Sequence, residues 1–388
     1  MPGMRGPTRW AAMAALAVLI AGCAVLADGG SRSPRHSAAA AVSSTPSTCA
    51  ATIDGTLRTI AMRVYHQAAA GGNVAAARKR IGHSTALAAA VLSGNARATR
   101  AALAHVRKGQ IHRIVVTRGA HVLADLGTAP ALAPVRGLIR DAAGVPVGRY
   151  TMAVNGRASL VGIIQGLTGA QVLVRSPGRP PAATQDRASF PMTVFPSGAR
   201  RMWLVFGPSS AACASSRQQT AADTIAAVGQ RLYKGEAGGP ATQRALRYVA
   251  HDRRFVRAVA QDDPVGLRAA IVRFFGIHHL HMVRVRATLP DGRLIEDVGG
   301  PFVLAPASTT LHDAGGRVIG RATLSVQDDT GYIKLMHRFT GASVVLRTGA
   351  GPVPGSAASA GGAGAQSVTY HVGAFPSGDL SVTLTVRS

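Results

Sequence analysis

The sequence predicts an α+β protein made of two copies of one module. Each copy has N-terminal helices followed by a five- or six-stranded, largely antiparallel sheet. The main observation is an internal repeat: residues 125–175 align without gaps with residues 297–347 at an offset of 172, and 17 of 51 positions are identical. A second observation is that apolar spacing changes from helical to alternating at the same point of each copy. The identical pairs include Asp125/Asp297, Gly127/Gly299, Gly144/Gly316, Gly148/Gly320, Thr168/Thr340 and Gly169/Gly341.

The offset between the copies falls to 168 upstream and grows to 180 downstream, as expected when loops between aligned elements differ in length. The residues that recur there are Arg63/Arg231, Tyr65/Tyr233 and the Phe-Pro-Ser-Gly sequences at 195–198 and 375–378. We therefore expect one module at 49–213 and a second at 218–388.

The elements of the first copy follow in order. Helices are predicted at 53–69, 74–82 and 84–107. Ser84, and Asp252 in the second copy, can cap the third helix because their side-chain oxygens accept orphan N–H groups. Strands at 111–117 and 122–125 lead to a loop of about twenty residues, then to a strand at 149–154, a helix at 157–167, a strand at 170–175 and a hairpin closed by Phe-Pro-Ser-Gly. The second copy repeats this order.

The first 22 residues are predicted to be a signal peptide. Arg5 and Arg9 precede an apolar stretch that ends at Ile20 and is shorter than a typical spanning helix. The sequence Ile-Ala-Gly-Cys at 20–23 resembles a bacterial lipobox, which implies that Cys23 is lipidated; the alternative is secretion with cleavage after Ala27. Either route takes the chain out of the cytoplasm. Residues 23–48, rich in Ser, Pro and Ala, are predicted to be a flexible tether.

The chain has three cysteines. If Cys23 carries lipid, Cys49 and Cys213 are left as a pair in an oxidising compartment, where a disulfide would join the two ends of the first module. The alternative is two free thiols.

The chain is strongly basic, with 43 Lys+Arg against 17 Asp+Glu and a formal charge of +26. An extracytoplasmic address excludes genomic DNA as the natural partner, and 4% aromatic residues are too few for a platform that stacks single-stranded nucleic acid. Arginine is scattered rather than clustered. Coding bias explains this pattern, and so does attraction to anionic polymers or lipid surfaces.

One stretch of the second copy resembles a known family. Residues 316–328 (Gly-Arg-Val-Ile-Gly-Arg-Ala-Thr-Leu-Ser-Val-Gln-Asp), Tyr332 and residues 339–346 resemble Cache domains, the extracellular PAS-like sensor modules of bacterial receptors. The expected hairpin around Asp291-Gly292 is similar to the central hairpin of that family. Because each copy carries its own helices, we expect two single-type modules in tandem. The resemblance implies a small ligand bound over a sheet face and, without an output domain in the sequence, action through a partner such as a membrane receptor.

Strand alternation favours the second copy as the ligand-binding one. Arg284 and Arg286 share one strand face, and the positions aligned with them in the first copy are Val115 and Thr117. Paired guanidinium groups bind a carboxylate or phosphate bidentately, so we expect a small carboxylate or similar organic anion there. Supporting groups would be His281, Asp328 and Tyr332. The alternative is a solvated sheet face or a surface that packs against the other copy.

Other chemistry has little support. The His-His-Leu-His sequence at 278–281 offers two imidazoles on one strand face, but no third ligand lies nearby in the sequence, so we expect no metal site. No nucleophile elbow, metalloprotease motif or phosphate-binding loop is present, and we expect neither an enzyme nor a cofactor. The rival to a sensor is a structural or adhesive envelope protein whose arginines hold anionic wall polymer or lipid headgroups. Salt would separate the two, because polyanion binding weakens steeply with ionic strength.

Overall fold

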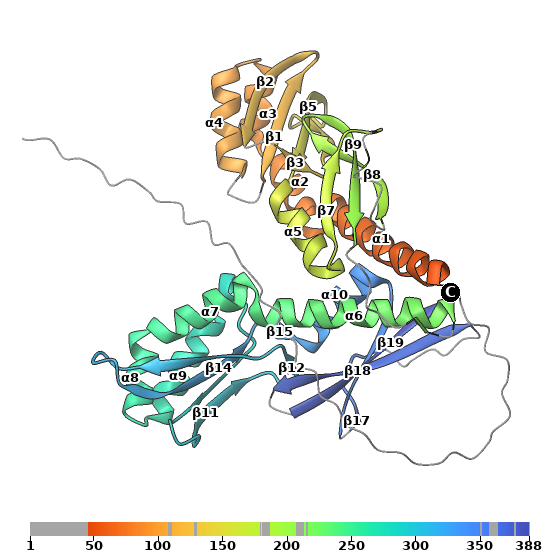
Figure 1. Ribbon diagram of the computed structural model, residues 1–388. Coiled ribbons are helices and arrows are strands. Elements are labelled where there is room, and N and C mark those ends of the chain that lie inside the picture. The colour runs from red at the N-terminus through yellow and green to blue at the C-terminus, as the bar shows by residue number, and fades with distance from the viewer. Residues whose placement is uncertain are drawn as a thin grey trace, which may run out of the picture. The chain divides into compact units, whose positions relative to one another are not determined.

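The computed structural model describes residues 46–387 except 108–110, 128–129, 179, 181–186, 207–212, 215, 350, 357–363 and 376–377. The predicted signal peptide, the lipidation of Cys23 and most of the predicted tether lie outside these residues. The first helix begins at Pro46, so the last residues assigned to the tether are helical. The α+β class and the two-module architecture are confirmed (Figure 1).

Module 1 contains one long helix, three short ones that follow it, and a fifth between strands. The helices are α1 (Pro46–Ala70), α2 (Gly72–Gly82), α3 (Thr85–Leu92), α4 (Ala96–Arg107) and α5 (Arg157–Thr168). The strands are β1 (Arg113–Arg118), β2 (His121–Gly127), β3 (Ala131–Leu132), β4 (Val135–Arg140), β5 (Pro146–Ala153), β6 (Asn155–Gly156), β7 (Gln171–Arg175), β8 (Arg187–Phe195) and β9 (Gly198–Val205).

The strands of module 1 form two sheets. One has the order β2-β1-β5-β4 and is covered by α2, α3 and α4, which contact β4, β5 and β2 respectively. The other has the order β6-β3-β8-β9-β7, with α1 against β8 and α5 against β7. All the pairings recorded within them are antiparallel.

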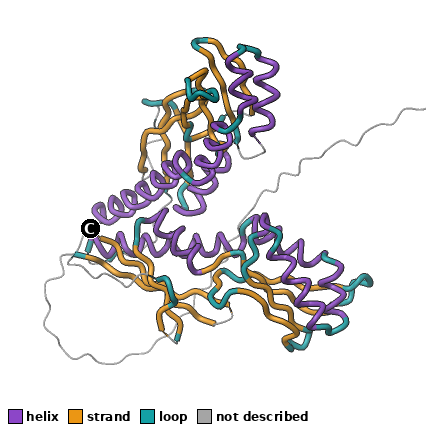
Figure 2. The backbone as a smooth tube through the Cα atoms, turned by 180° about the vertical axis from the view of Figure 1, so that it is seen from behind, coloured by secondary structure: helices purple, strands orange, loops and turns teal. Residues whose placement is uncertain are grey.

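Module 2 repeats this plan (Figure 2). Its helices are α6 (Arg217–Gly238), α7 (Pro240–His251), α8 (Arg253–Ala260), α9 (Pro264–Phe275), the 3-10 helix η1 (His278–Leu280) and α10 (Asp329–Thr340). Its strands are β10 (Arg284–Thr288), β11 (Leu294–Gly299), β12 (Val303–Leu304), β13 (Ala307–His312), β14 (Val318–Ser325), β15 (Gln327–Asp328), β16 (Ser343–Thr348), β17 (Gly351–Pro352), β18 (Ala365–Phe375) and β19 (Gly378–Arg387). The sheets have the orders β11-β10-β14-β13 and β15-β12-β18-β19-β16-β17.

Two details differ from the sequence prediction. The helix expected at 84–107 is two helices, because Gly94 adopts φ +69° and Asn95 caps α4 by accepting a hydrogen bond from the Ala98 N–H. The expected loop after β2 contains β3 and β4. The apolar alternation of β4, an edge strand, is weak because residue 137 is a glycine. The ring of Tyr150 occupies the space of a side chain there, since a Cβ at Gly137 would be 2.3 Å from it.

The expectation of single-type modules also changes. Each module has one long helix followed by two small sheets, so the strands predicted for one sheet are divided between two. The short strand after β2 or β11, which is β3 or β12, joins the second sheet, and the chain then returns to the first sheet with β4 and β5 or β13 and β14. It passes to the second sheet at β6 or β15, which pairs with that short strand. A single sequence gives no sign of this, because both sheets use the same antiparallel alternation.

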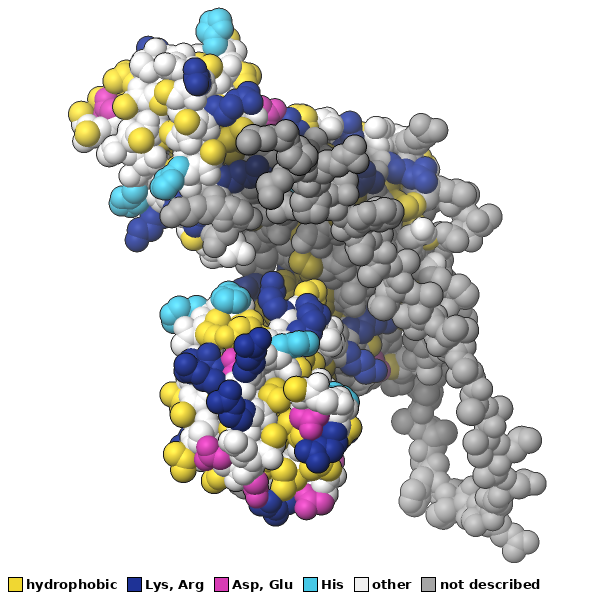
Figure 3. Space-filling model, turned by 90° about the vertical axis from the view of Figure 1, so that its left-hand side faces the viewer, with side chains coloured by type: hydrophobic (Ala, Val, Ile, Leu, Met, Phe, Trp, Pro, Cys, Tyr) yellow, Lys and Arg dark blue, Asp and Glu magenta, His cyan; other side chains and the backbone are white. Residues whose placement is uncertain are grey.

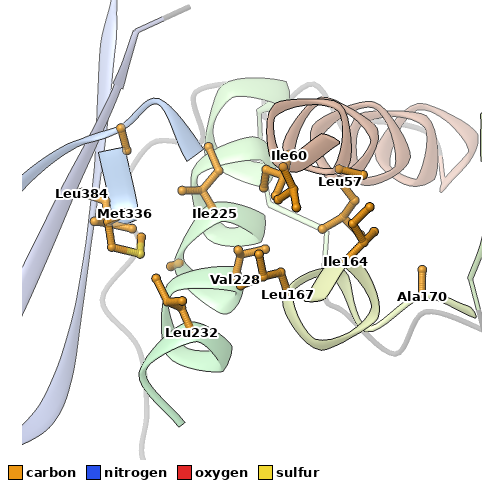
Figure 4. Packing of buried hydrophobic residues seen from close by; sticks show 14 of the residues in the cluster. Leu57, Ile60, Ile164, Leu167, Ala170, Ile225, Val228, Leu232, Met336 and Leu384 are labelled. Atoms are coloured by element: carbon orange, nitrogen blue, oxygen red, sulfur yellow. The ribbon is translucent and has the colours of Figure 1, made fainter. Parts of the chain in front are cut away.

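Three apolar clusters form the core. Each four-stranded sheet and its helices enclose one. The third cluster is shared by both modules, because α1 and α5 of module 1 pack against α6 and, through α1, against α10. Figure 4 shows this packing. The residues labelled there include Leu57, Ile60, Ile164, Leu167, Ile225, Val228 and Met336.

Candidate functional site

The two arginines that the sequence singled out bind a carboxylate of the protein itself. Arg284 and Arg286 lie on β10, and Asp297 lies beside them on β11. The Arg284 Nε donates to Asp297 Oδ1 at 2.7 Å, and the Arg286 Nε and terminal nitrogen donate to Asp297 Oδ2 at 2.9 and 2.6 Å. Arg284 also donates to the carbonyl of Gly300. The carboxylate of Asp297 therefore binds both guanidinium groups that were expected to bind a ligand.

Charge keeps this carboxylate ionised. Partial burial by itself would raise the pKa of Asp297, but the hydrogen bonds and charges of Arg284 and Arg286 outweigh it, and the pKa is lowered. The side chains of Arg284 and Asp297 are only 12% and 11% exposed. The three groups form a half-buried ion-pair network within the sheet.

Module 1 carries a version of the same network, contrary to the sequence alignment. Arg113 pairs across the strands with Gly127, as Arg284 does with Gly299, so these two arginines occupy equivalent positions. Arg113 donates to both oxygens of Asp125 at 3.1 and 2.6 Å. The expected absence of a cation in copy one was wrong, because the true offset of β10 from β1 is 171 residues. Only Arg286, opposite Asp297 as Val115 is opposite Asp125, is particular to module 2.

The other three predicted residues lie in different settings. His281 is exposed, just after η1, with φ +50°. Asp328 is the N-cap of α10 and accepts from the Gly331 N–H at 2.6 Å. Tyr332 is fully buried, and its hydroxyl bonds the Tyr370 hydroxyl at 2.7 Å and donates to the Gly229 carbonyl at 3.2 Å. Burial, with the neighbouring Tyr370, raises the pKa of Tyr332 far above its ordinary value. Tyr332 is thus a core residue and does not line a ligand surface.

An open cleft lies in module 1, where α5 begins. It has a volume of about 560 Å³, within the range of small-molecule sites. The lining residues are His112, Pro130, Gly156, Arg157, Ala158, Ser159, Val161 and Val172. Two of them are basic and none is a carboxylate. The His112 imidazole lies against Gly156, since a Cβ at Gly156 would be 2.6 Å from His112 Cε1.

The start of α5 lacks the carboxylates that begin α10. Gly156 is the N-cap of α5, with no side chain to accept from the first-turn N–H groups, and the first turn contains no acidic residue. At the same place in module 2, Asp328 caps the helix and Asp329 is in its first turn. The partial positive charge of a helix N-terminus is therefore met by protein carboxylates in α10 and left to the cleft in α5.

The corresponding hollow beside α10 is filled. It is lined by Phe302, Asp329, Val353 and five other residues, and has no volume for a ligand. Phe302 aligns with Pro130 of module 1. The larger phenyl ring lines the filled hollow of module 2, and the smaller proline lines the open cleft of module 1. Sequence analysis missed Arg157 and gave His112 no role. The signal was visible in the repeat, where Gly156 and Arg157 align with Asp328 and Asp329.

Two further observations concern the described residues as a whole. Among them, no three His, Cys, Asp or Glu side chains come together in a way that could hold a metal ion. No helix among the described residues combines the length and the apolar character needed to cross a membrane. The side chains of Cys49 and Cys213 form a disulfide with Cα atoms 5.9 Å apart, which joins α1 to the chain after β9 as the sequence predicted.

Comparison with known proteins assigns no family. No protein-family model matches the chain, and no curated protein sequence matches it. Among solved structures, the periplasmic domain of Vibrio cholerae LuxQ aligns with 11% sequence identity and a TM-score of 0.32, over 43% of this chain and all of that domain. A TM-score this low does not establish a common fold, so the Cache resemblance stays a prediction.

Proposed function

We propose that this chain is an extracytoplasmic, lipid-anchored protein that binds a small organic anion, and that module 1 holds the ligand. The observation that carries the proposal is the cleft before α5, with its uncapped helix start and two basic side chains. Binding rather than catalysis is the proposed activity. Coupling to a membrane partner, which the sequence suggested, is part of the same proposal.

The chemistry of the cleft favours a carboxylate. A ligand carboxylate would take the place that the Asp328 side chain has in module 2 and accept from the Ser159 N–H, the counterpart of the Gly331 N–H. The Arg157 N–H donates to the Pro130 carbonyl at 3.2 Å. The guanidinium group of Arg157, at the first position of the helix, suits bidentate pairing with it. Pro130, Val161 and Val172 offer an apolar wall for the rest of the molecule. Together these groups fit a small acid with a short hydrocarbon body.

The same comparison explains why module 2 is the weaker candidate. Its two arginines are held by Asp297, and the start of its α10 is capped by Asp328. An external anion would have to displace a carboxylate that is already in place. In module 1 no such displacement is needed at α5.

Calorimetric titration of the mature protein with a panel of mono-, di- and tricarboxylic acids tests the proposal. We expect one acid to bind, and Arg157→Ala to weaken it at least about tenfold, as loss of a charge-assisted pair does. Arg286→Ala is the matched control, because it removes an arginine from the site first expected and leaves Arg284 with Asp297. Equal affinity in Arg157→Ala and wild type, or no binding by any acid, would refute the proposal.

A further inference from the structure

The two modules meet through equivalent parts, and one arginine from each reaches across. Arg63 on α1 and Arg231 on α6 are matched by the repeat. Each lies over the left-handed glycine that ends the short helix of the other module, Gly341 with φ +78° and Gly169 with φ +71°. A Cβ at Gly341 would be 2.7 Å from a terminal nitrogen of Arg63, and one at Gly169 would be 3.0 Å from the Arg231 Cζ. The C-terminal ends of α5 and α10 therefore each face a cation.

Arg63 and Arg231 differ in the hydrogen bonds that they make. Arg231 donates to the carbonyls of Thr168 at 3.0 Å and Leu167 at 3.4 Å, and burial lowers its pKa. Within the part of the chain that the structure describes, Arg63 makes neither a hydrogen bond nor an ion pair with the protein. One of two matched arginines is thus committed to the other module, and the second retains its donors.

A cleft of about 560 Å³ opens around Arg63. Its lining residues come from α1 of module 1 and from α6, α10, β16, β19 and Gly341 of module 2, so both modules contribute. The lining includes His337 and Ser343 near the end of α10, Thr59 on α1, and the apolar Ile225 and Val386. None of the described residues that line this cleft is a carboxylate, and the α10 terminus beside Arg63 carries only a partial negative charge.

We propose that this junction cleft is a second binding site, for a small hydroxylated anion such as a sugar phosphate or a sugar acid. The Arg63 guanidinium group binds the phosphate or carboxylate group of the ligand. The Thr59 hydroxyl, which donates to the Gly55 carbonyl, and the Ser343 hydroxyl accept hydrogen bonds from the hydroxyl groups of the ligand. Sites between domains are common for small ligands. Because residues of both modules line the cleft, a bound ligand stabilises the contact between the modules. The site is separate from the cleft at Arg157 and does not depend on it.

The experiment is calorimetric titration of the full mature chain at constant ionic strength with three probes: inorganic phosphate, glucose 6-phosphate and gluconate, with sorbitol as the uncharged control. We expect glucose 6-phosphate or gluconate to bind and sorbitol not to bind. Arg63→Ala weakens binding at least tenfold, and Arg63→Lys restores part of it. The matched variant Arg231→Ala keeps the wild-type affinity, because its guanidinium group bonds the α5 carbonyls and not the ligand.

Two results overturn the proposal: no charged probe binds, or Arg63→Ala binds as wild type does. Circular dichroism confirms that each variant is folded, and the exposed position of Arg63 favours this. Arg157→Ala separates the two sites. If binding of these probes is lost in Arg157→Ala and kept in Arg63→Ala, the ligand occupies the α5 cleft and the junction site is refuted. The reverse pattern supports the junction site whether or not the α5 cleft binds carboxylic acids.

Discussion

The two modules share a backbone plan and differ in where their charges are satisfied. At the start of α10 in module 2, Asp328 and Asp329 supply the negative charge that a helix N-terminus favours, whereas α5 in module 1 begins with Gly156 and Arg157. Module 2 also gives both Arg284 and Arg286 to Asp297, while module 1 has only Arg113 for Asp125. The two modules therefore share their turns and strand pairs, and they differ in the positions of their charged and polar side chains. Module 1 was left with the open, uncompensated cleft.

The cores of the two modules also differ in their polar groups. Tyr332 and Tyr370 bond each other inside module 2, where the aligned residues of module 1 are Leu160 and Phe190. Both members of each pair are buried. A buried hydroxyl needs a partner, so the two tyrosines satisfy each other, and module 1 avoids the requirement with apolar side chains.

Removing the disulfide should have the largest effect, and it should act on one module. Cys49 and Cys213 enclose 164 residues of sequence separation, and residues 218–388 contain no cysteine. The chain-entropy relation gives about 5 kcal/mol for a loop of this length. Urea unfolding of wild type and Cys49→Ser/Cys213→Ser, followed by fluorescence of Trp203 in β9, measures it. In a chain that begins at Cys23 the sequence has Trp203 as its single tryptophan, so the signal of that chain reports module 1. An unchanged Trp203 transition would show that the bridge does not stabilise this module.

The second largest effect is expected from the ion-pair networks, whose loss should destabilise module 2 more than module 1. Asp297→Ala leaves Arg284 and Arg286 without their carboxylate, and we expect a cost of about 3 kcal/mol. Asp125→Ala, whose carboxylate is 39% exposed, should cost about 1 kcal/mol or less. Because the pKa of Asp297 is lowered on folding, its contribution is present above about pH 4 and is lost as the pH falls through the folded value. Chemical denaturation at pH 7 and pH 3 measures both variants. Equal costs for the two aspartates would contradict the difference between the networks.

The tyrosine pair should give a smaller effect than Asp297→Ala at neutral pH and a distinct one in alkali. Tyr332→Phe leaves the Tyr370 hydroxyl without its partner and should cost about 1–2 kcal/mol, whereas Tyr332→Phe/Tyr370→Phe, which removes both hydroxyls, should be nearly neutral. Burial raises the pKa of Tyr370 to about 12 and that of Tyr332 further. A raised folded pKa gives stability that is complete below pH 10 and is lost as the pH rises through 12. Thermal melts from pH 8 to 12 should show a flatter decline for the double variant than for wild type, and parallel curves would sink this account.

Much of the fold follows from local sequence. The repeat, the helix caps at Ser84 and Asp252 and the left-handed glycines Gly169 and Gly341 all carry signals within a few residues. Those signals are strong because capping and positive φ restrict residue type directly. The division of each module into two sheets carried no such signal, since strand alternation is the same in either sheet. The edge strand β4 was missed for a different reason, because Gly137 weakens its alternation.

The candidate site required distances that spacing does not contain. Parity correctly placed Arg284 and Arg286 on one strand face, but only the register of β10 against β11 brought Asp297 to both of them. The excess of arginine in the sequence did not indicate where the candidate site lies. On the face shown in Figure 3, Lys and Arg side chains are interspersed with apolar and polar ones over both parts of the chain that are visible.

The sequence by itself determined the α+β class and the duplication, because these depend on residue type and periodicity. It predicted the pairing of Cys49 with Cys213 and left two free thiols as the alternative, and the structure decided for the disulfide. Tertiary structure decided which charges are free to meet a ligand. A charged side chain remains available only if no opposite charge or carbonyl reaches it, and that depends on neighbours far away in sequence. Asp297 reaches Arg284 and Arg286, and the α5 carbonyls reach Arg231. Among the residues that the structure describes, no carboxylate lines the cleft before α5 or the junction cleft around Arg63.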